Sequence, residues 1–140
     1  EFETLIRDEG LLISGTIDVV RLDDPPRITI IDFKSGERGE ETQSGLSENM
    51  MRLQIGIYGL AARHELEYEP DQGLVRYIGE ENPEHKQLSV QLNQEELDTA
   101  RQIVIDAGRR IKSRIFNEGP TTIDRCENCD HRVVCGLCPR

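Results

Sequence analysis

Residues 28–36 read Ile-Thr-Ile-Ile-Asp-Phe-Lys-Ser-Gly, a β-strand that ends in a charged pair and a Ser-Gly break. Because side chains alternate between the two faces of a strand, Asp32 and Lys34 are expected on one face, and Ile31 and Phe33 on the opposite, apolar face. A charged pair at the end of a hydrophobic strand is expected at the rim of a sheet, within reach of substrate. On spacing alone, a solvated strand face explains the same pattern.

The segment upstream predicts the partner of this strand. Residues 11–20 are rich in β-branched residues, and the turn-forming segment 22–27 contains two aspartates and two prolines. The short connection requires an antiparallel hairpin over 11–34. If the hairpin centres on Pro25, Asp18 lies directly opposite Asp32, with Cβ atoms about 4.5–5.5 Å apart.

Two carboxylates this close repel each other unless a cation lies between them. Mg²⁺ or Mn²⁺ would resolve the repulsion of Asp18 and Asp32, since hard cations prefer oxygen ligands. The backbone carbonyl of Phe33 would add a third oxygen, and Lys34 would orient or deprotonate a metal-bound water. The alternative is that Asp18 is an edge-strand charge that discourages aggregation.

The remaining pattern predicts a small α/β or α+β domain in which helices flank a mixed sheet. Gln54 and Tyr58 lie four residues apart on a predicted helix, so they share one of its faces. Asn93 and Glu96 form a capping-box-like start to a second helix. The expected elements are an entry strand in 1–10, strands at 73–79 and 88–92, and helices at 48–64 and 93–117.

Length and charge limit the classes of protein. The chain has 140 residues and a net charge of −10, which fits one domain with one core and no membrane-spanning helix. The acidic balance argues against a protein that holds nucleic acid by bulk positive charge. The acidic charge does not exclude an enzyme that binds a metal ion through carboxylates.

All four cysteines lie within the last fifteen residues, as the pairs Cys126-x-x-Cys129 and Cys135-x-x-Cys138. A disulfide scaffold would spread its cysteines through the chain, so the cluster predicts a metal or iron–sulfur site in a reducing, cytoplasmic compartment. Four thiolates suit Zn²⁺ or a [4Fe–4S] cluster. Free thiols are the third alternative.

Four motifs in order resemble the RecB-like branch of the PD-(D/E)XK nuclease superfamily. They are Gly15-x-Ile17-Asp18, the Asp32-x-Lys34-Ser35-Gly36 segment, Gln54-x-x-x-Tyr58 and the spacing of Cys126, Cys129 and Cys135. The resemblance implies a restriction-endonuclease-like nuclease core over 1–120 and a Cys-rich tail over 121–140, packed on the same domain.

The resemblance also implies roles for these residues. Asp18 and Asp32 match the acidic metal ligands, Lys34 matches the catalytic lysine, and Gln54 and Tyr58 match the motif near the active site. Iron–sulfur relatives use three terminal cysteines and one far upstream, so Cys126, Cys129 and Cys135 match cluster ligands, with Cys138 as an extra candidate.

The activity implied is Mg²⁺- or Mn²⁺-dependent hydrolysis of DNA, of exonuclease type, in a helicase-attached or AddB-like protein of recombination or repair. The family has an earlier helix with a His or Glu near the metal, so we expect this sequence to be a fragment of a longer polypeptide, and its isolated activity to depend on that helix. Two alternatives stay open: a non-catalytic DNA-binding or scaffolding module of the same fold, and a zinc-tailed protein-interaction domain.

Overall fold

A computed structural model describes residues 1–36 and 48–115, together with Cys126 and Cys129. It divides into two compact units, Glu1–Ile105 and Asp106–Arg140. The boundary predicted between residues 120 and 121 lies outside the described residues. Within them, neither helix is both long and apolar enough to cross a membrane.

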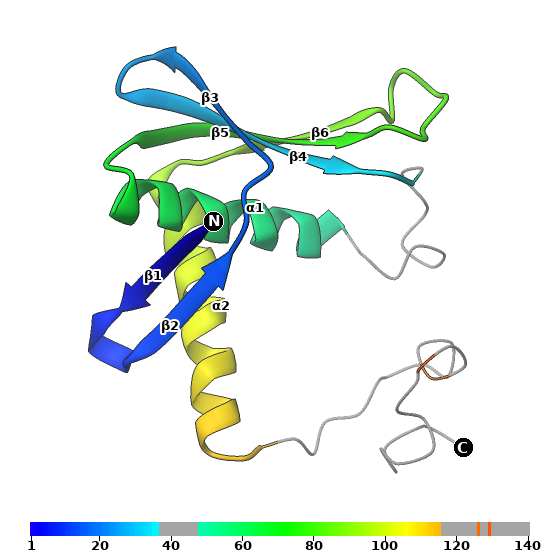
Figure 1. Cartoon of the computed structure of the whole chain (residues 1–140). Helices are drawn as coiled ribbons and strands as arrows, with labels where there is room; N and C mark the ends of the chain where they lie inside the picture. The colour runs from blue at the N-terminus through cyan, green and yellow to red at the C-terminus, as the bar shows by residue number, and fades with distance from the viewer. Residues whose placement is uncertain (37–47, 116–125, 127–128, 130–140) are drawn as a thin grey trace. The chain divides into compact units, whose positions relative to one another are not determined.

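A four-stranded mixed sheet forms the centre of the first unit (Figure 1). The two inner strands are parallel and each edge strand is antiparallel to its neighbour, which confirms the predicted mixed sheet. In spatial order the strands are β3 (Val19–Asp24), β4 (Arg27–Lys34), β5 (Glu69–Tyr77) and β6 (Gln87–Gln91).

Strand β4 is central because its apolar run is buried on both faces, as Ile30 and Ile31 show. The prediction that Phe33 lies on an apolar face was wrong, since Phe33 is 41% exposed, and Asp32 is buried instead of open to solvent. Strand β3 begins at Val19, which pairs with Ile31, so Phe33 lies beyond the end of the β3–β4 ladder. Asp32 instead faces the side of the sheet that carries the core.

The first two strands form a separate hairpin, β1 (Phe2–Ile6) and β2 (Leu11–Gly15), joined by a 3₁₀ turn at Arg7–Glu9. The predicted entry strand is therefore confirmed, but the continuous strand over 11–20 is wrong. The chain leaves the first hairpin after Gly15 and joins the main sheet at Val19. Each half of the predicted strand pairs with a different neighbour, so the ladder breaks between them.

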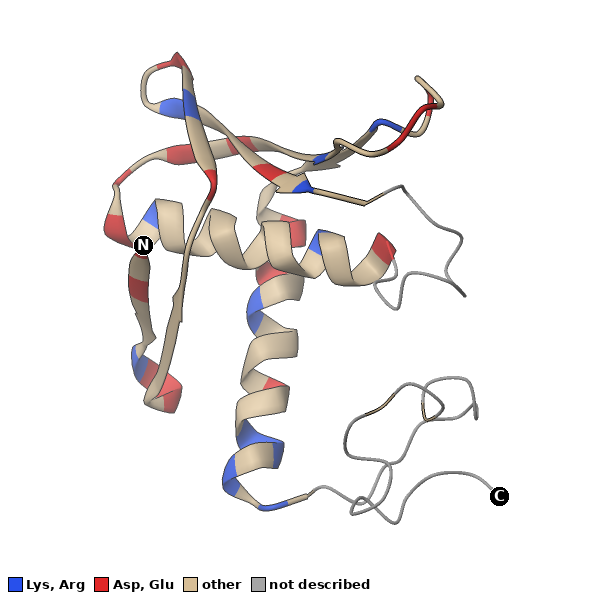
Figure 2. Cartoon of the chain, turned by 45° about the vertical axis from the view of Figure 1, so that its right-hand side comes forward, with Lys and Arg blue, Asp and Glu red and all other residues tan. Residues whose placement is uncertain are grey.

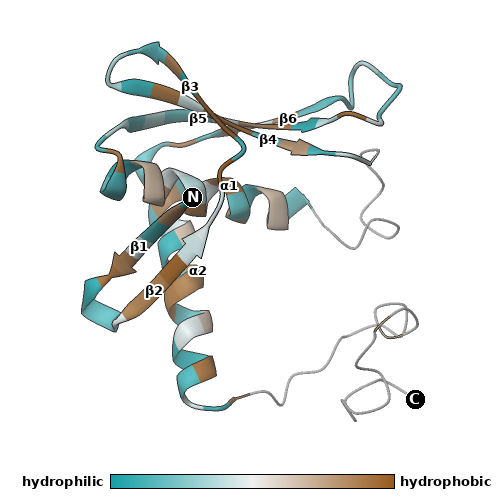
Figure 3. Ribbon diagram, viewed as in Figure 1, coloured by the Kyte–Doolittle hydropathy of each residue, from teal (hydrophilic) through white to brown (hydrophobic). Residues whose placement is uncertain are grey.

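Helix α1 (Glu48–Glu65) confirms the prediction for 48–64 and lies against one face of the sheet (Figure 1). Its buried residues Met51 and Ile55 join the core beneath β4 and β5. Ile55 packs against Gly73 of β5, where there is no room for a side chain. Figure 3 shows hydrophobic residues concentrated towards the middle of the sheet.

Helix α2 (Gln94–Lys112) begins as predicted, because Asn93 Oδ1 accepts a hydrogen bond from the Glu96 backbone N–H at 2.9 Å. The prediction that it continues to about 117 was wrong: it ends at Lys112. Its last turn is basic, with Arg109, Arg110 and Lys112, as the blue segments in Figure 2 show. Positive side chains near a helix C-terminus interact favourably with the helix dipole, so these residues stabilise the end of α2.

Candidate active site

The predicted charged pair lies at the carboxyl ends of the parallel strands β4 and β5. Asp32 is only 3% exposed, and its Oδ2 atom lies 2.7 Å from Lys34 Nζ. Both side chains are on the α1 side of the sheet, because residues two apart on a strand share a face. A buried carboxylate is costly unless it is paired, and Lys34 supplies the opposite charge.

Gln54 joins this pair to helix α1. Its Oε1 atom accepts a hydrogen bond from Lys34 Nζ at 3.0 Å, and its Nε2 atom donates to Asp32 Oδ1 at 3.3 Å. The same Nε2 donates to the hydroxyl of Tyr58 at 2.7 Å, one helical turn further along. The structure therefore brings four predicted site residues, Asp32, Lys34, Gln54 and Tyr58, into one hydrogen-bonded group.

Asp18 approaches the same strand end from β3. The pairing of Val19 with Ile31, extended by one residue, places Asp18 opposite Asp32, which is the register predicted from the turn. Asp18 is exposed at the bend before β3, and its Oδ2 atom accepts a hydrogen bond from the Phe33 backbone N–H at 2.8 Å. This bond ties the acidic residue to β4. A ligand role for the Phe33 carbonyl stays a prediction.

The donor set suits a small divalent cation. Asp32 Oδ2 is buried, and the Lys34 ammonium lies 2.7 Å from it. Carboxylate oxygens are the ligands that hard cations prefer. No group of three or more His, Cys, Asp or Glu side chains placed for a metal occurs in the described part of the chain. The carboxylates of Asp18 and Asp32 are oxygen donors of the kind that Mg²⁺ and Mn²⁺ bind, and these ions also keep several waters.

Sequence reasoning missed one residue next to this group. The ring of Phe2 meets the ring of Tyr58 edge-on, with centroids 5.9 Å apart and an interplanar angle of 78°. The alternation of Phe2, Thr4 and Ile6 indicates a buried face of β1. It does not reveal that this face reaches the site tyrosine.

The cysteine tail is described only at two positions of the second unit. Cys126 is buried, Cys129 is exposed, and the Cys129 backbone N–H donates to the Cys126 carbonyl at 3.2 Å. This hydrogen bond links the backbones of the first two predicted cluster ligands. Cys135 and Cys138 lie outside the described residues.

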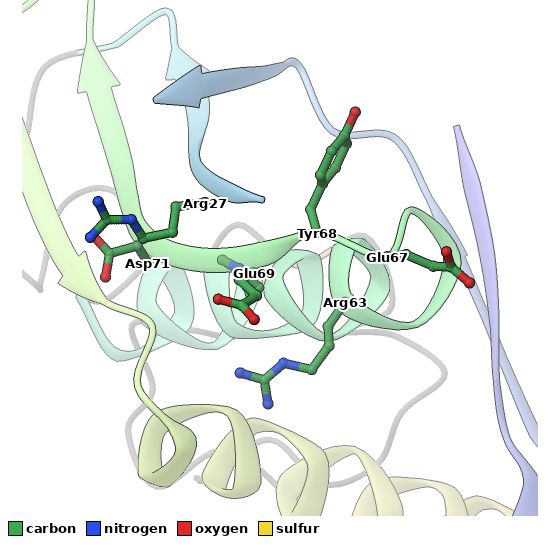
Figure 4. Close-up of a pocket in the computed structure, with 7 residues that line it drawn as sticks. Arg27, Arg63, Glu67, Tyr68, Glu69 and Asp71 are labelled. Atoms are coloured by element: carbon green, nitrogen blue, oxygen red, sulfur yellow. The ribbon is translucent and has the colours of Figure 1, made fainter. Parts of the chain in front are cut away.

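A pocket of about 410 Å³ lies at the opposite end of the parallel strands, beside Arg27 and Glu69 (Figure 4). Cations and anions are mixed in its wall. No residue of the four motifs lines it, so it is distinct from the candidate active site. The lining residues are Arg27, Arg63, Glu67, Tyr68, Glu69, Pro70 and Asp71.

The sequence matches the family model of the PD-(D/E)XK nuclease superfamily over residues 1–136. No curated protein matches the chain.

Proposed function

The chain belongs to the PD-(D/E)XK nuclease superfamily, and from that premise we propose that it hydrolyses phosphodiester bonds in DNA with Mg²⁺ or Mn²⁺ at the Asp18–Asp32 end of β4. The observation that carries this proposal is the group formed by Asp32, Lys34 and Gln54, in which a buried carboxylate at the end of β4 is paired with a lysine ammonium.

Asp32 and Asp18 would hold the cation through their carboxylate oxygens. When bound, such a cation lowers the pKa of a coordinated water and stabilises negative charge on the phosphate. The Lys34 side chain lies beside Asp32, where it would stabilise the charge that develops on the phosphate oxygens. Gln54 holds the Lys34 ammonium through its carbonyl oxygen and is itself held by the Tyr58 hydroxyl.

The order of the four motifs supports a finer assignment. We infer a RecB-like or AddB-like nuclease of exonuclease type that acts with a DNA helicase in recombination or repair. The net charge of −10 supports dependence on a partner, because the 27 acidic residues outnumber the 17 basic ones and repel DNA. Cysteines in closely spaced pairs support a reducing, cytoplasmic location.

Cleavage of labelled single- and double-stranded DNA tests the activity. We expect cleavage with Mg²⁺ or Mn²⁺ and none with EDTA. Asp32→Asn and Lys34→Met should each lower the rate by about 100-fold or more, because each removes several kcal/mol of charge stabilisation and each 1.36 kcal/mol is a factor of ten.

Asp24→Asn is the matched control for that assay, since Asp24 is an exposed aspartate on the β3–β4 hairpin and pairs with Arg27 at the surface. It should cleave at the rate of the unmodified protein. Equal rates in Asp32→Asn, Lys34→Met and the unmodified protein would exclude the nuclease assignment. Binding of DNA without any cleavage would favour the scaffolding alternative.

For the tail, we propose a structural [4Fe–4S] cluster that includes Cys126, Cys129 and Cys135, with Cys138 as a further candidate. The backbone hydrogen bond from Cys129 to Cys126 supports a shared ligand site. Protein purified without oxygen should show broad visible absorption that Cys126→Ala removes. Stoichiometric zinc in place of iron, with no visible band, would establish the zinc alternative.

A further inference from the structure

Phe2 lies on β1, outside all four motifs, yet its ring touches the tyrosine of the site. The two rings meet edge to face, with centroids 5.9 Å apart. This arrangement is favourable because the positive edge of one ring meets the negative face of the other. The contact therefore favours one orientation of the Tyr58 ring over others.

The Phe2 ring also packs against Gly15, its cross-strand partner on β2. A Cβ atom at Gly15 would lie 2.9 Å from Phe2 Cζ and 3.0 Å from Cε1. The ring thus packs directly over backbone that only glycine leaves open. Gly15 is the first residue of the Gly15-x-Ile17-Asp18 motif. A residue of this motif therefore helps to set the position of the Phe2 ring.

The orientation of Tyr58 matters because its hydroxyl accepts a hydrogen bond from Gln54 Nε2 at 2.7 Å. That bond turns the amide so that its oxygen faces Lys34 and its nitrogen faces Asp32. A rotated amide would present a donor to the lysine and an acceptor to the carboxylate, and both contacts would be repulsive.

We propose that Phe2 is a positioning residue that holds the Lys34 ammonium in place through Tyr58 and Gln54. The proposal rests on the nuclease function proposed above for the group of Asp32 and Lys34. Gly15, Phe2, Tyr58 and Gln54 form a continuous series of contacts from the first hairpin to the catalytic lysine.

A double-mutant cycle tests the route of this effect. Phe2→Leu should lower kcat for DNA cleavage roughly 3–10-fold with KM nearly unchanged, since it disturbs positioning rather than DNA binding. In the Tyr58→Phe background, which already lacks the hydroxyl, the same substitution should lower kcat less than about twofold, because interacting residues are not additive. A merely structural role predicts the same factor in both backgrounds, and that result would overturn the proposal.

Leu5→Ala is the matched control, because Leu5 lies on the same strand with its side chain on the exposed face. It should leave kcat unchanged. If Phe2→Leu unfolds the protein, Phe2→Met keeps an apolar side chain of similar length without a ring edge, and the same cycle applies. Gly15→Ala displaces the ring from the other side and should mimic the kcat loss.

A measurement that needs no activity separates this proposal from the nuclease assignment. The side-chain amide resonances of Gln54, assigned by NMR with Gln54→Asn, should shift in Phe2→Leu towards their positions in Tyr58→Phe, and should not shift in Leu5→Ala. Unchanged Gln54 resonances in Phe2→Leu would refute the role of Phe2. An unmodified protein that cleaves no DNA, with the Gln54 shifts as expected, would refute the nuclease assignment and leave the contact series established.

Discussion

Asp23 accepts hydrogen bonds from two side chains of the β3–β4 hairpin. The Thr29 hydroxyl donates to Asp23 Oδ2 at 2.6 Å, and Arg21 Nε donates to Oδ1 at 2.7 Å. These two hydrogen bonds hold the pKa of Asp23 below the usual 3.8, and the bond from the Thr29 hydroxyl has the larger effect. Since the folded-state pKa is lowered, the stabilisation is complete well above pH 3.8 and is lost as the pH falls through the folded-state pKa.

Asp23→Asn should therefore destabilise the protein at neutral pH, and the difference from the unmodified protein should shrink as the pH falls below 3.8. Urea unfolding at pH 7 and at about pH 3 measures both values. Asp24→Asn is the control, since Asp24 is 79% exposed and surface pairs contribute little. A stability difference for Asp23→Asn that does not depend on pH would contradict this account.

The relative placement of two site residues was predictable where both lie on the same strand or helix. The alternation of Asp32 and Lys34, and the helical spacing of Gln54 and Tyr58, require only the geometry of one strand or one helix. The burial of Asp32 was not predictable, because the face of β4 that is covered depends on where α1 packs. Phe2 was missed for a related reason: its contact with Tyr58 joins residues 56 positions apart in the sequence.

Helices α1 and α2 approach closely because α1 carries glycines on the facing side. A Cβ atom at Gly56 would lie 2.6 Å from Ala100 Cβ, and one at Gly59 would lie 2.7 Å from Leu97 Cδ2. Glycine inside a helix ordinarily weakens it. In the structure these two glycines are what allows the N-terminal half of α2 to pack on α1.

Gly56→Ala should consequently destabilise the protein by about 1 kcal/mol. Overpacking costs about 1–3 kcal/mol, and the better helix propensity of alanine returns up to about 1 kcal/mol. Thermal or urea unfolding measures the net change. The double variant Gly56→Ala/Ala100→Gly removes the overlap and should recover part of the loss, whereas a stabilising Gly56→Ala would show that the helices do not meet here.

At the level of elements, both helices and the main sheet were predictable, since each has a clear period or alternation. The break between β2 and β3 was not, because β-branched and other apolar residues occur on both sides of it in residues 11–20. What separates the two strands is the choice of partner: Gly15 pairs with Phe2, and Val19 pairs with Ile31. Local sequence patterns do not show which distant segment a strand pairs with.

Across the whole molecule, the negative charge and the proposed cation site are linked. With 17 basic and 27 acidic residues, the folded chain repels itself, and any salt will screen that repulsion. A cation that binds specifically would stabilise the fold in another way, because its proposed site between Asp18 and Asp32 exists only in the folded protein. Stabilisation by Mg²⁺ or Mn²⁺ therefore has to be separated from general screening.

At a cation concentration 100 times its Kd, a site present only in the folded state adds about 2.7 kcal/mol. For a domain of this length, that predicts a rise in Tm on the order of 10 °C at constant ionic strength. Asp32→Asn should abolish the rise, because it removes the buried carboxylate that would bind the cation. Asp23→Asn removes the same charge away from the site, so the cation should still raise its Tm in full. If the cation raises Tm equally in both variants, the effect is screening of the acidic surface and the carboxylates of Asp18 and Asp32 hold no specific ion.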